Sequence, residues 1–540
     1  MPESKCKHVV AILIDNTSGE KFLEFLNQGL FPNLKKYVLD RGSFCQHSIC
    51  QFPSSSANGH TTLATGMFQS KSGVLNAAWW DTSGKVPVPY KVDSINVSTI
   101  YLWDKIIKAK TMFEWIPNKD SASFHTIKRG AGFKFFQMRT LIKYIGVFLK
   151  MKFGGVEAVT SKKGVFETLI LNVFKKYVKD LQAKKKFPML TFLLFLPTDD
   201  KAHKFGHDSE EYKEAISLVD YLVGALVDGF DEKGRHVPGI KELGYFDSTA
   251  IVLFADHSSK PFGRENTVDM VTKLKVDFPW KCYSSPILDN TFESFKKEKG
   301  AHWDALTYEG GEHIPLYLPA GNGHARRSIS VEDLQTYRTD GVAVNFKDYF
   351  FSVDAVIRLY HPIDSDTILV HSRDGIAQMT QLRGGDANVR QYKYELLEGA
   401  DPLNYIDDAP ELADGQFHSH LEWLRGTYLA TYPNVPEHMF GFFNNENAPT
   451  LIVTAKSGWV FTHPEDPEDH TAIYVNQHDG EYRYEVSTPL IFGGAGVKQG
   501  VEIDVCQNVD MLPTMLKLLG IKFAPGDFHG RALDEFLDAE

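Results

Sequence analysis

The chain has 540 residues, of which 43% are hydrophobic and 24% are charged, and its formal net charge is −11. This balance excludes intrinsic disorder and fibrous architectures, and the acidic sum argues against general binding to nucleic acid. The length suits three or four average domains, or one large α/β domain with an insertion. The five cysteines are scattered and form no CxxC pair, so we expect reduced thiols rather than a disulfide framework or a structural zinc module.

No stretch approaches the about 18 to 20 consecutive apolar residues of a membrane span. The polar start leads directly into the short apolar run 9–14, which does not match an export signal. We therefore expect a soluble chain that works in the cytoplasm, or one that is exported and has lost its leader.

Three apolar runs are typical of strands buried on both faces of a sheet, namely residues 9–14, 190–196 and 250–255. A carboxylate follows each run: Asp15, Asp199 and Asp256. In open parallel α/β sheets, ligands bind outside the carboxyl ends of the strands. The pattern therefore predicts one shared site at which the three carboxylates meet.

The segments 209–230 and 509–519 have the apolar period of helices that pack on a sheet, which predicts a doubly wound α/β core. Residues 261–449 do not continue this pattern of buried strands and packed helices. Within them, Asp374-Gly375 between two β-prone runs indicates a hairpin. We therefore predict a catalytic core formed by residues 1–260 and 450–540, interrupted by an inserted α+β cap over 261–449. Strands of the core sheet are expected to resume at 450–453 and 489–492.

One segment departs from the acidic average: residues 128–186 carry 15 basic and three acidic side chains. Aromatic and aliphatic residues lie among the basic ones in its first part, 128–152. A basic amphipathic helix of this kind can contact an anionic membrane surface. The ordinary alternative is a solvated helix face with core contacts, and the sequence leaves both readings open.

The types and spacing of the residues near the three strand ends suit metal ions. Asp199 and His203 stand four apart, so that on a helical turn they share one face, and His257 directly follows Asp256. Together with Asp15 they supply the oxygen and nitrogen ligands that Zn²⁺ and Mn²⁺ accept. Each residue alone is more often a cap, a loop carboxylate or an exposed side chain, but their joint placement favours a site for two metal ions.

A nucleophile is expected in the small polar run 54–65. This run can form a loop that leads into a helix, where a hydroxyl lies near unpaired backbone N–H groups that favour an anionic phosphoryl group. A run of serines alone is a weak signal, because most such runs are turns or N-caps.

The ordered motifs FPSSSANGHTTLATG (52–66), TDDKAHKFG (198–206) and ADHSS (255–259), with Asp15 before them and a late histidine, resemble the alkaline phosphatase superfamily. Within it, the chain is most similar to the nucleotide pyrophosphatase/phosphodiesterase, or type I phosphodiesterase, branch. The likeness covers roughly residues 8–81, 190–260 and 450–535. It implies an alkaline-phosphatase-like fold, with a mostly parallel central sheet flanked by helices.

The resemblance also implies two zinc ions, with Mn²⁺ as the alternative. One zinc would be held by Asp15, Asp256 and His257, and the other by Asp199, His203 and a later histidine. That histidine is predicted to be His478, with His463 and His470 as rivals. The nucleophile of the family stands four residues before a histidine, which gives Ser56, also a metal ligand; Ser54 and Ser55 remain alternatives.

One position departs from the family pattern. The family commonly places an asparagine, whose amide binds a phosphoryl oxygen, where this chain has Ala77. Asn76 is one residue early and is the predicted replacement, with Asn58 as a second candidate. Trp79 and Trp80 are expected either to line a substrate pocket or to pack beneath the loop.

These observations predict a two-metal phosphoester hydrolase that acts through a phosphoserine at Ser56. The expected substrates are small phosphodiesters, either nucleotides or lipid headgroups, rather than nucleic-acid polymers. A phosphomonoesterase of the same fold is the nearest alternative. A membrane-surface binding protein with a silent metal site is the alternative from a different class, and the sequence leaves the oligomeric state undetermined.

Overall fold

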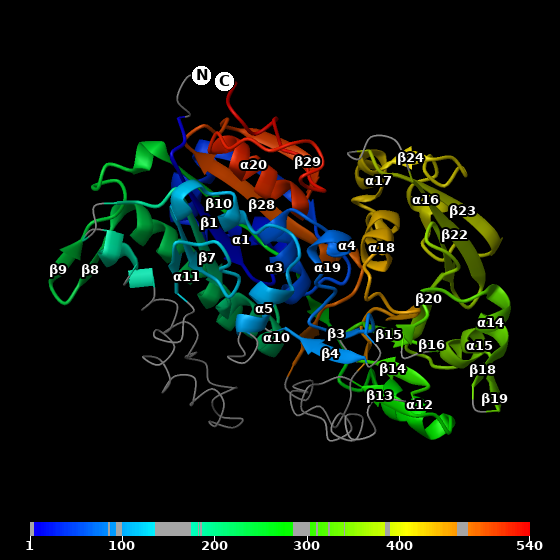
Figure 1. Cartoon of the computed structure of the whole chain (residues 1–540). Coiled ribbons are helices and arrows are strands. Elements are labelled where there is room, and N and C mark those ends of the chain that lie inside the picture. Colours follow the sequence, from blue (N-terminus) through cyan, green and yellow to red (C-terminus); the bar gives the residue numbers. More distant parts are fainter. Residues whose placement is uncertain are drawn as a thin grey trace.

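The computed structural model describes residues 5–84, 87–92, 100–135, 174–175, 177–181, 183, 186–284, 303–308, 311–321, 324–339, 341–383, 389–461 and 474–539. Two lobes, each built on one large β-sheet, lie side by side (Figure 1). The five cysteines are buried and unbridged, as the sequence predicted.

The sheet of the first lobe has eight strands in the order β29-β2-β28-β10-β1-β7-β5-β6. Their bounds are β1 His8–Ile14, β2 Gly42–Ile49, β5 Ser121–Phe124, β6 Phe133–Lys134, β7 Leu190–Phe195, β10 Thr249–Phe254, β28 Ser487–Gly494 and β29 Val501–Gln507. β1 lies parallel between β10 and β7, whereas β28 runs antiparallel to both of its neighbours. The three predicted buried strands are confirmed, and they are adjacent in the sheet.

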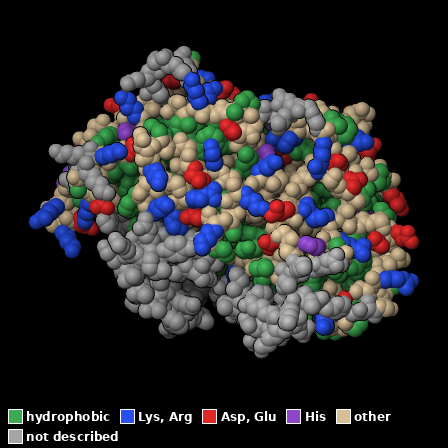
Figure 2. All heavy atoms as spheres, viewed as in Figure 1, with side chains coloured by type: hydrophobic (Ala, Val, Ile, Leu, Met, Phe, Trp, Pro, Cys, Tyr) green, Lys and Arg blue, Asp and Glu red, His purple; other side chains and the backbone are tan. Residues whose placement is uncertain are grey.

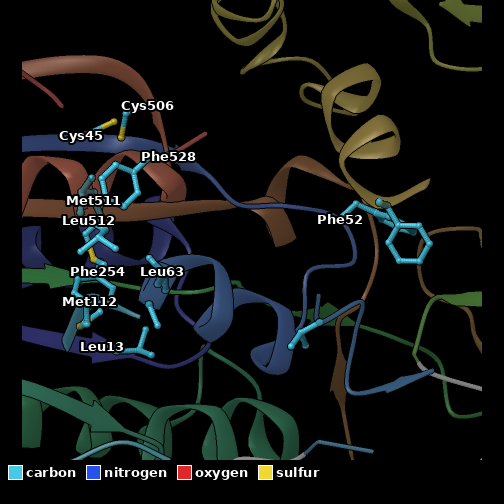
Figure 3. Close-up of a cluster of buried hydrophobic side chains, with 14 of the residues drawn as sticks. Leu13, Cys45, Phe52, Leu63, Met112, Phe254, Cys506, Met511, Leu512 and Phe528 are labelled. Carbon is cyan, nitrogen blue, oxygen red and sulfur yellow. The ribbon is translucent and has the colours of Figure 1, made fainter. Parts of the chain in front are cut away.

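Helices cover both faces of this sheet because β1, β7 and β10 are apolar on both sides. On one face, Val10 and Ile12 pack with helices α1 (Gly19–Asn27), α2 (Pro32–Tyr37) and α11 (Glu210–Asp228). On the other face, Leu13 and Phe254 meet Leu63 of α3 (Ser56–Thr65) and Met511 and Leu512 of α20 (Met511–Leu518) (Figure 3). The predicted helices over 209–230 and 509–519 correspond to α11 and α20.

The second sheet has nine strands in the order β13-β14-β15-β25-β20-β21-β22-β23-β24. Their bounds are β13 Cys282–Ser284, β14 Ala305–Thr307, β15 His313–Tyr317, β20 Val356–Pro362, β21 Thr367–His371, β22 Gly375–Leu382, β23 Gln391–Gly399, β24 His418–Ser419 and β25 Leu451–Ala455. Helices α12 (Met270–Asp277), α14 (Val331–Thr336), α15 (Phe346–Phe351), α17 (His420–Thr427) and α18 (Val435–Phe443) belong to the same part of the chain. The predicted hairpin is confirmed, since β21 and β22 pair antiparallel across Asp374-Gly375.

The strand expected at 450–453 belongs to this second sheet and not to the core sheet. β25 pairs antiparallel with β15 and with β20. A short, continuously apolar run fits the interior of either sheet, so its pattern could not distinguish them. The domain boundaries at 260/261 and 449/450 stay a prediction.

One apolar cluster joins the two lobes. It includes Leu13 and Phe254 of the first sheet and Tyr360 and Met379 of the second, and it also contains Phe52. Figure 3 shows Phe52 next to α18, away from the side chains that pack on the first sheet. The second lobe is therefore anchored to the first by shared core packing.

The basic segment predicted to contact a membrane lies mostly outside the described residues. At its start, Lys128 is buried and donates to the carbonyl of Thr126, and Arg129 donates to the carbonyl of Ile107. Residues 136–152 are not described, so the amphipathic helix stays a prediction. Among the described helices, none has both the length and the apolar character needed to cross a bilayer. On the face shown in Figure 2, basic and acidic side chains are interspersed.

A buried ion pair connects the second sheet to the segment before β28. Arg358 of β20 donates from Nε to Oε1 of Glu481 over 2.8 Å, and both residues are 1% exposed. Tyr360 donates to the other carboxylate oxygen of Glu481. Removing one partner of such a pair leaves an uncompensated charge in a dry environment.

We expect Arg358→Met to lower the free energy of unfolding by about 3–5 kcal/mol. The matched control is Lys456→Met, which removes an ion pair to Asp354, a residue 75% exposed, and should cost less than about 1 kcal/mol. Urea denaturation followed by tryptophan fluorescence compares the two variants. Equal destabilisation of both would contradict the role assigned to the buried pair.

Candidate active site

The three predicted carboxylates meet at one edge of the first sheet. Asp15 directly follows β1 and Asp256 follows β10, while Asp199 lies in the first turn of α10 (Pro197–Phe205), which begins after β7. Asp15 and Asp256 are fully buried. Because the three strands are parallel and adjacent, their carboxyl ends deliver the side chains to the same place.

The ligand atoms form two neighbouring groups, in each of which they lie within 4.8 Å of one another: Asp199, His257 and His478 in the first, and Asp15, His60 and Asp256 in the second. His257 links the groups, since its Nε2 lies 3.3 Å from Oδ2 of Asp256 and 3.6 Å from Oδ1 of Asp15. His203 is also present, with Nε2 3.2 Å from Oδ1 of Asp199.

Ser56 lies between these groups, at the first residue of α3. Its Oγ is 3.0 Å from Nε2 of His257 and 3.4 Å from Oδ1 of Asp15. The alternative serines point elsewhere: Ser54 donates to the carbonyl of Gly480, and Ser55 donates to Asn76. The geometry therefore favours Ser56 among the three.

Three histidines can offer Nε2 to a metal ion, because an oxygen that can only accept lies against each Nδ1 and fixes a proton there. Nδ1 of His203 is 2.9 Å from the carbonyl of Asn476, Nδ1 of His257 is 3.2 Å from the carbonyl of Ser258, and Nδ1 of His478 is 2.8 Å from the carboxylate of Asp479. A proton on Nδ1 leaves the lone pair of Nε2 available to a metal ion. The rival residues His463 and His470 lie outside the described residues.

The electrostatics of the site suit divalent cations. Burial, together with the negative charges of Asp256 and Asp199, raises the pKa of Asp15 well above its usual range. Burial opposes the ionisation of Asp199, but His203 and His478 outweigh it and lower the pKa of that carboxyl. The Oδ2 atoms of Asp15 and Asp256 are buried and lack an aligned hydrogen bond. Crowded carboxylates with neighbouring imidazoles are a donor set that fits Zn²⁺ or Mn²⁺.

The two asparagines predicted to contact a phosphoryl group lie next to the serine run 54–56, since Asn76 accepts from Ser55 and Asn58 donates to Pro53. Asn76 is buried, and its Nδ2 makes only long contacts, 3.4 Å to Nε2 of His313 and 3.5 Å to the hydroxyl of Tyr308. The side-chain amide of Asn58 donates to the carbonyl of Pro53, and this hydrogen bond stabilises the loop that precedes α3.

Trp79 and Trp80 are both buried side chains. They are 2% and 0% exposed. Trp79 stacks on Tyr90 with 5.4 Å between ring centroids, and Trp80 donates to the carbonyl of Thr307 over 2.9 Å. Both indoles therefore pack inside the structure, and their contact with substrate stays a prediction.

Sequence reasoning missed two residues that touch the carboxylates. His60 lies one helical turn after Ser56 and faces Asp15 and Asp256, and the i+4 spacing is the signal that could have found it. Asn16 donates from its side chain to Asp199 over 2.9 Å and from its backbone to Asp256 over 3.3 Å. Its φ of 60° is one that asparagine tolerates better than most residues.

Comparison with known proteins places this geometry in a wider context. The sequence model of the family described as type I phosphodiesterase / nucleotide pyrophosphatase matches residues 9–281, just over half of the chain. The venom phosphodiesterase of Naja atra is 22% identical over 228 residues, which is 42% of this chain but only 23% of the venom protein. The chain thus matches less than a quarter of the length of that curated relative.

Solved structures of similar fold include murine ectonucleotide pyrophosphatase/phosphodiesterase 5 in an inactive form with AMP, at a TM-score of 0.52 and 12% identity, with 96% of each chain covered. The human counterpart gives a TM-score of 0.52 at 12% identity and covers 98% of this chain and all of that one. At this identity the likeness concerns the fold alone. It confirms the predicted alkaline-phosphatase-like α/β fold.

The close approach of α3 to Asp256 yields a test of the site. A Cβ added at Gly59 would lie 2.8 Å from Cβ of Asp256, so Gly59→Ala should displace that carboxylate and lower the zinc bound per chain. The control is Gly441→Ala in α18, where the nearest atom lies at 3.4 Å. Metal analysis after zinc loading and dialysis compares them. Full zinc content in Gly59→Ala would refute the steric argument.

Proposed function

The chain belongs to the type I phosphodiesterase/nucleotide pyrophosphatase family, and from this premise we propose that it hydrolyses small phosphodiesters at a two-metal site with Ser56 as nucleophile. One observation carries the proposal. The Oγ of Ser56 lies at a helix N-terminus, within 3.4 Å of both Asp15 and His257 and between two Asp/His groups.

The donor sets define which residues would hold the ions. Asp15, Asp256, His257 and Ser56 would hold one ion, and Asp199, His203 and His478 the other. When bound, zinc or manganese would supply Lewis-acid stabilisation of negative charge on oxygen. The oxygens that accept from Nδ1 of His203, His257 and His478 fix the orientation of these rings, so that Nε2 of each would bind the ion.

The side chains and backbone around Ser56 account for the remaining chemistry. Oγ of Ser56 loses its proton to solvent and forms a bond to phosphorus as the bond to the leaving oxygen breaks, and the leaving oxygen takes up a proton as an alcohol. Water later cleaves the phosphoserine ester, which releases the phosphate monoester and restores the hydroxyl. The first N–H groups of α3 have no partner within the helix, so they favour the negatively charged phosphoryl group. Asn76, whose Nδ2 makes only long contacts among the described residues, is the residue we propose to donate to a phosphoryl oxygen.

The charge of the site supports a diester in preference to a monoester. The charged groups that act most strongly on Asp15, Asp199 and Asp256 are one another and nearby histidines, with no lysine or arginine among them. Among the proposed ligands alone, three carboxylates against two divalent cations would leave a single positive charge. That charge matches the single negative charge of a diester, whereas a monoester dianion would leave the complex negative.

Ser56→Ala should lower the rate of phosphodiester hydrolysis about a thousandfold or more, because no other hydroxyl replaces the nucleophile. Its zinc content should persist, since Asp15, Asp256 and His257 remain. Ser54→Ala is the control and should retain most activity. Undiminished turnover in Ser56→Ala would refute the assignment. Mass spectrometry of acid-quenched protein should detect phosphate on Ser56 of the unmodified chain and no phosphorylated residue in Ser56→Ala.

The zinc-loaded protein should hydrolyse bis-p-nitrophenyl phosphate faster than p-nitrophenyl phosphate, and a chelator should abolish both activities. Fast turnover of the monoester with an untouched diester would favour the phosphomonoesterase alternative. No turnover of either compound, together with sedimentation on anionic liposomes, would favour the membrane-binding alternative. A panel of nucleotide and lipid-headgroup diesters then identifies the substrate class.

A further inference from the structure

Two buried histidines at the proposed metal site have no part in the reaction described above. His60 lies on α3 one turn after Ser56, and His125 follows β5; both are 0% exposed. Nε2 of His125 is 3.0 Å from Nδ1 of His60, so one of these nitrogens donates to the other.

A backbone amide decides the direction of that hydrogen bond. The N–H of Ile127 points to Nδ1 of His125 over 2.7 Å, and a backbone N–H can only donate. Nδ1 of His125 is therefore an acceptor, and the single proton of the neutral ring lies on Nε2. It follows that His125 donates to Nδ1 of His60, which leaves Nε2 as the nitrogen of His60 that carries a proton.

The protonated Nε2 of His60 faces two carboxylates at once. It lies 3.2 Å from Oδ2 of Asp15 and 3.1 Å from Oδ2 of Asp256. One N–H is thus shared between two oxygens, which agrees with the lack of a well-aligned hydrogen bond to either one. The negative charge of the carboxylates favours a proton at this position.

This arrangement is the reverse of the one at the three proposed ligands. His203, His257 and His478 each have a proton on Nδ1, so Nε2 is the nitrogen that each can offer to a metal ion. His60 accepts at Nδ1 and offers a hydrogen atom at Nε2. Its proximity to Asp15 and Asp256 therefore suits a hydrogen-bond donor and not a metal ligand.

We propose that His60 is a positioning residue, whose Nε2–H holds Oδ2 of Asp15 and of Asp256, while His125 fixes the tautomer that makes this contact attractive. The proposal rests on the two-metal site proposed above. With Oδ2 of Asp15 held from behind, its Oδ1 is directed toward Ser56, at 3.4 Å. Outer contacts of this kind orient carboxylate ligands before the metal ion binds.

Aromatic packing keeps both imidazoles in this orientation. The ring of His60 stacks on Trp103 with 5.8 Å between centroids and 11° between planes. The ring of His125 stacks on Phe192 at 5.0 Å and 22°. Trp103 is itself fixed, because its Nε1 donates to Thr61 over 2.8 Å. The two histidines therefore have little freedom to exchange donor and acceptor by rotation.

The decisive variant is His125→Phe, which keeps an aromatic ring but removes the donor to His60. His60 can then take the other tautomer, whose Nε2 lone pair faces and repels the carboxylates. We expect zinc affinity at the site formed by Asp15, Asp256 and His257 to fall about 10- to 100-fold, with the second zinc unchanged. Competition with a chromophoric chelator measures both dissociation constants without reference to activity.

The alternative assignment predicts the opposite sign. If His60 were a metal ligand through Nε2, loss of the donor from His125 would favour the ligating tautomer, and zinc affinity would stay the same or increase. Either result would overturn the proposal. His125→Gln, whose amide nitrogen can take the place of Nε2, should restore most of the affinity and remains informative if the phenylalanine variant folds poorly. His371→Phe, at a buried histidine of the second sheet, is the control.

A second readout tests the proton order directly. In protein labelled with ¹⁵N-histidine, Nδ1 of His60 and of His125 should be unprotonated, and Nδ1 of His203, His257 and His478 should be protonated. A protonated Nδ1 on His60 would overturn the proposal. Intact zinc affinities without hydrolysis of any phosphoester would refute the proposed function alone.

Discussion

Mutual repulsion of three crowded carboxylates is the constraint on which the rest of the site depends. Val9 of β1 pairs with Leu190 of β7 and with Ala250 of β10, so the three strands end nearly level and bring Asp15, Asp199 and Asp256 together. Like charges at short range in a dry site repel strongly. The neighbouring imidazoles, the N–H groups of Asn16 and the proposed cations all offset this repulsion, and the sheet register prevents the carboxylates from moving apart.

Features of the site that depend on a single segment of the chain could be predicted from the sequence. The apolar runs before Asp15 and Asp256 were identified because a strand buried on both faces needs no alternation. Ser56 and His203 followed from the resemblance to the family and from helical spacing. Contacts between distant segments could not be predicted in the same way. The apolar run of β25 fits either sheet equally well, and the hydrogen bond from His125 to His60 joins the segment after β5 to α3.

The second lobe contributes to the site through backbone contacts as well as through shared core packing. Gly311, just before β15, lies so close to the segment of His478 that a Cβ there would approach its carbonyl oxygen to 2.3 Å. Glu481, three residues further along, is held by Arg358 of the second sheet. The segment that carries the last proposed ligand therefore contacts both lobes, and a displacement of one lobe would move that segment relative to the proposed metal site.

The amide of Ile127 has a consequence for how this chain can vary. The direction of every proton from His125 to the two carboxylates originates in that main-chain group, so no replacement of the Ile127 side chain other than proline removes it. Evolution can exchange Ile127 for another residue of similar volume and keep the direction of the hydrogen bonds from His125 through His60 to the two carboxylates. Proline is the exception, because its ring nitrogen has no hydrogen to give.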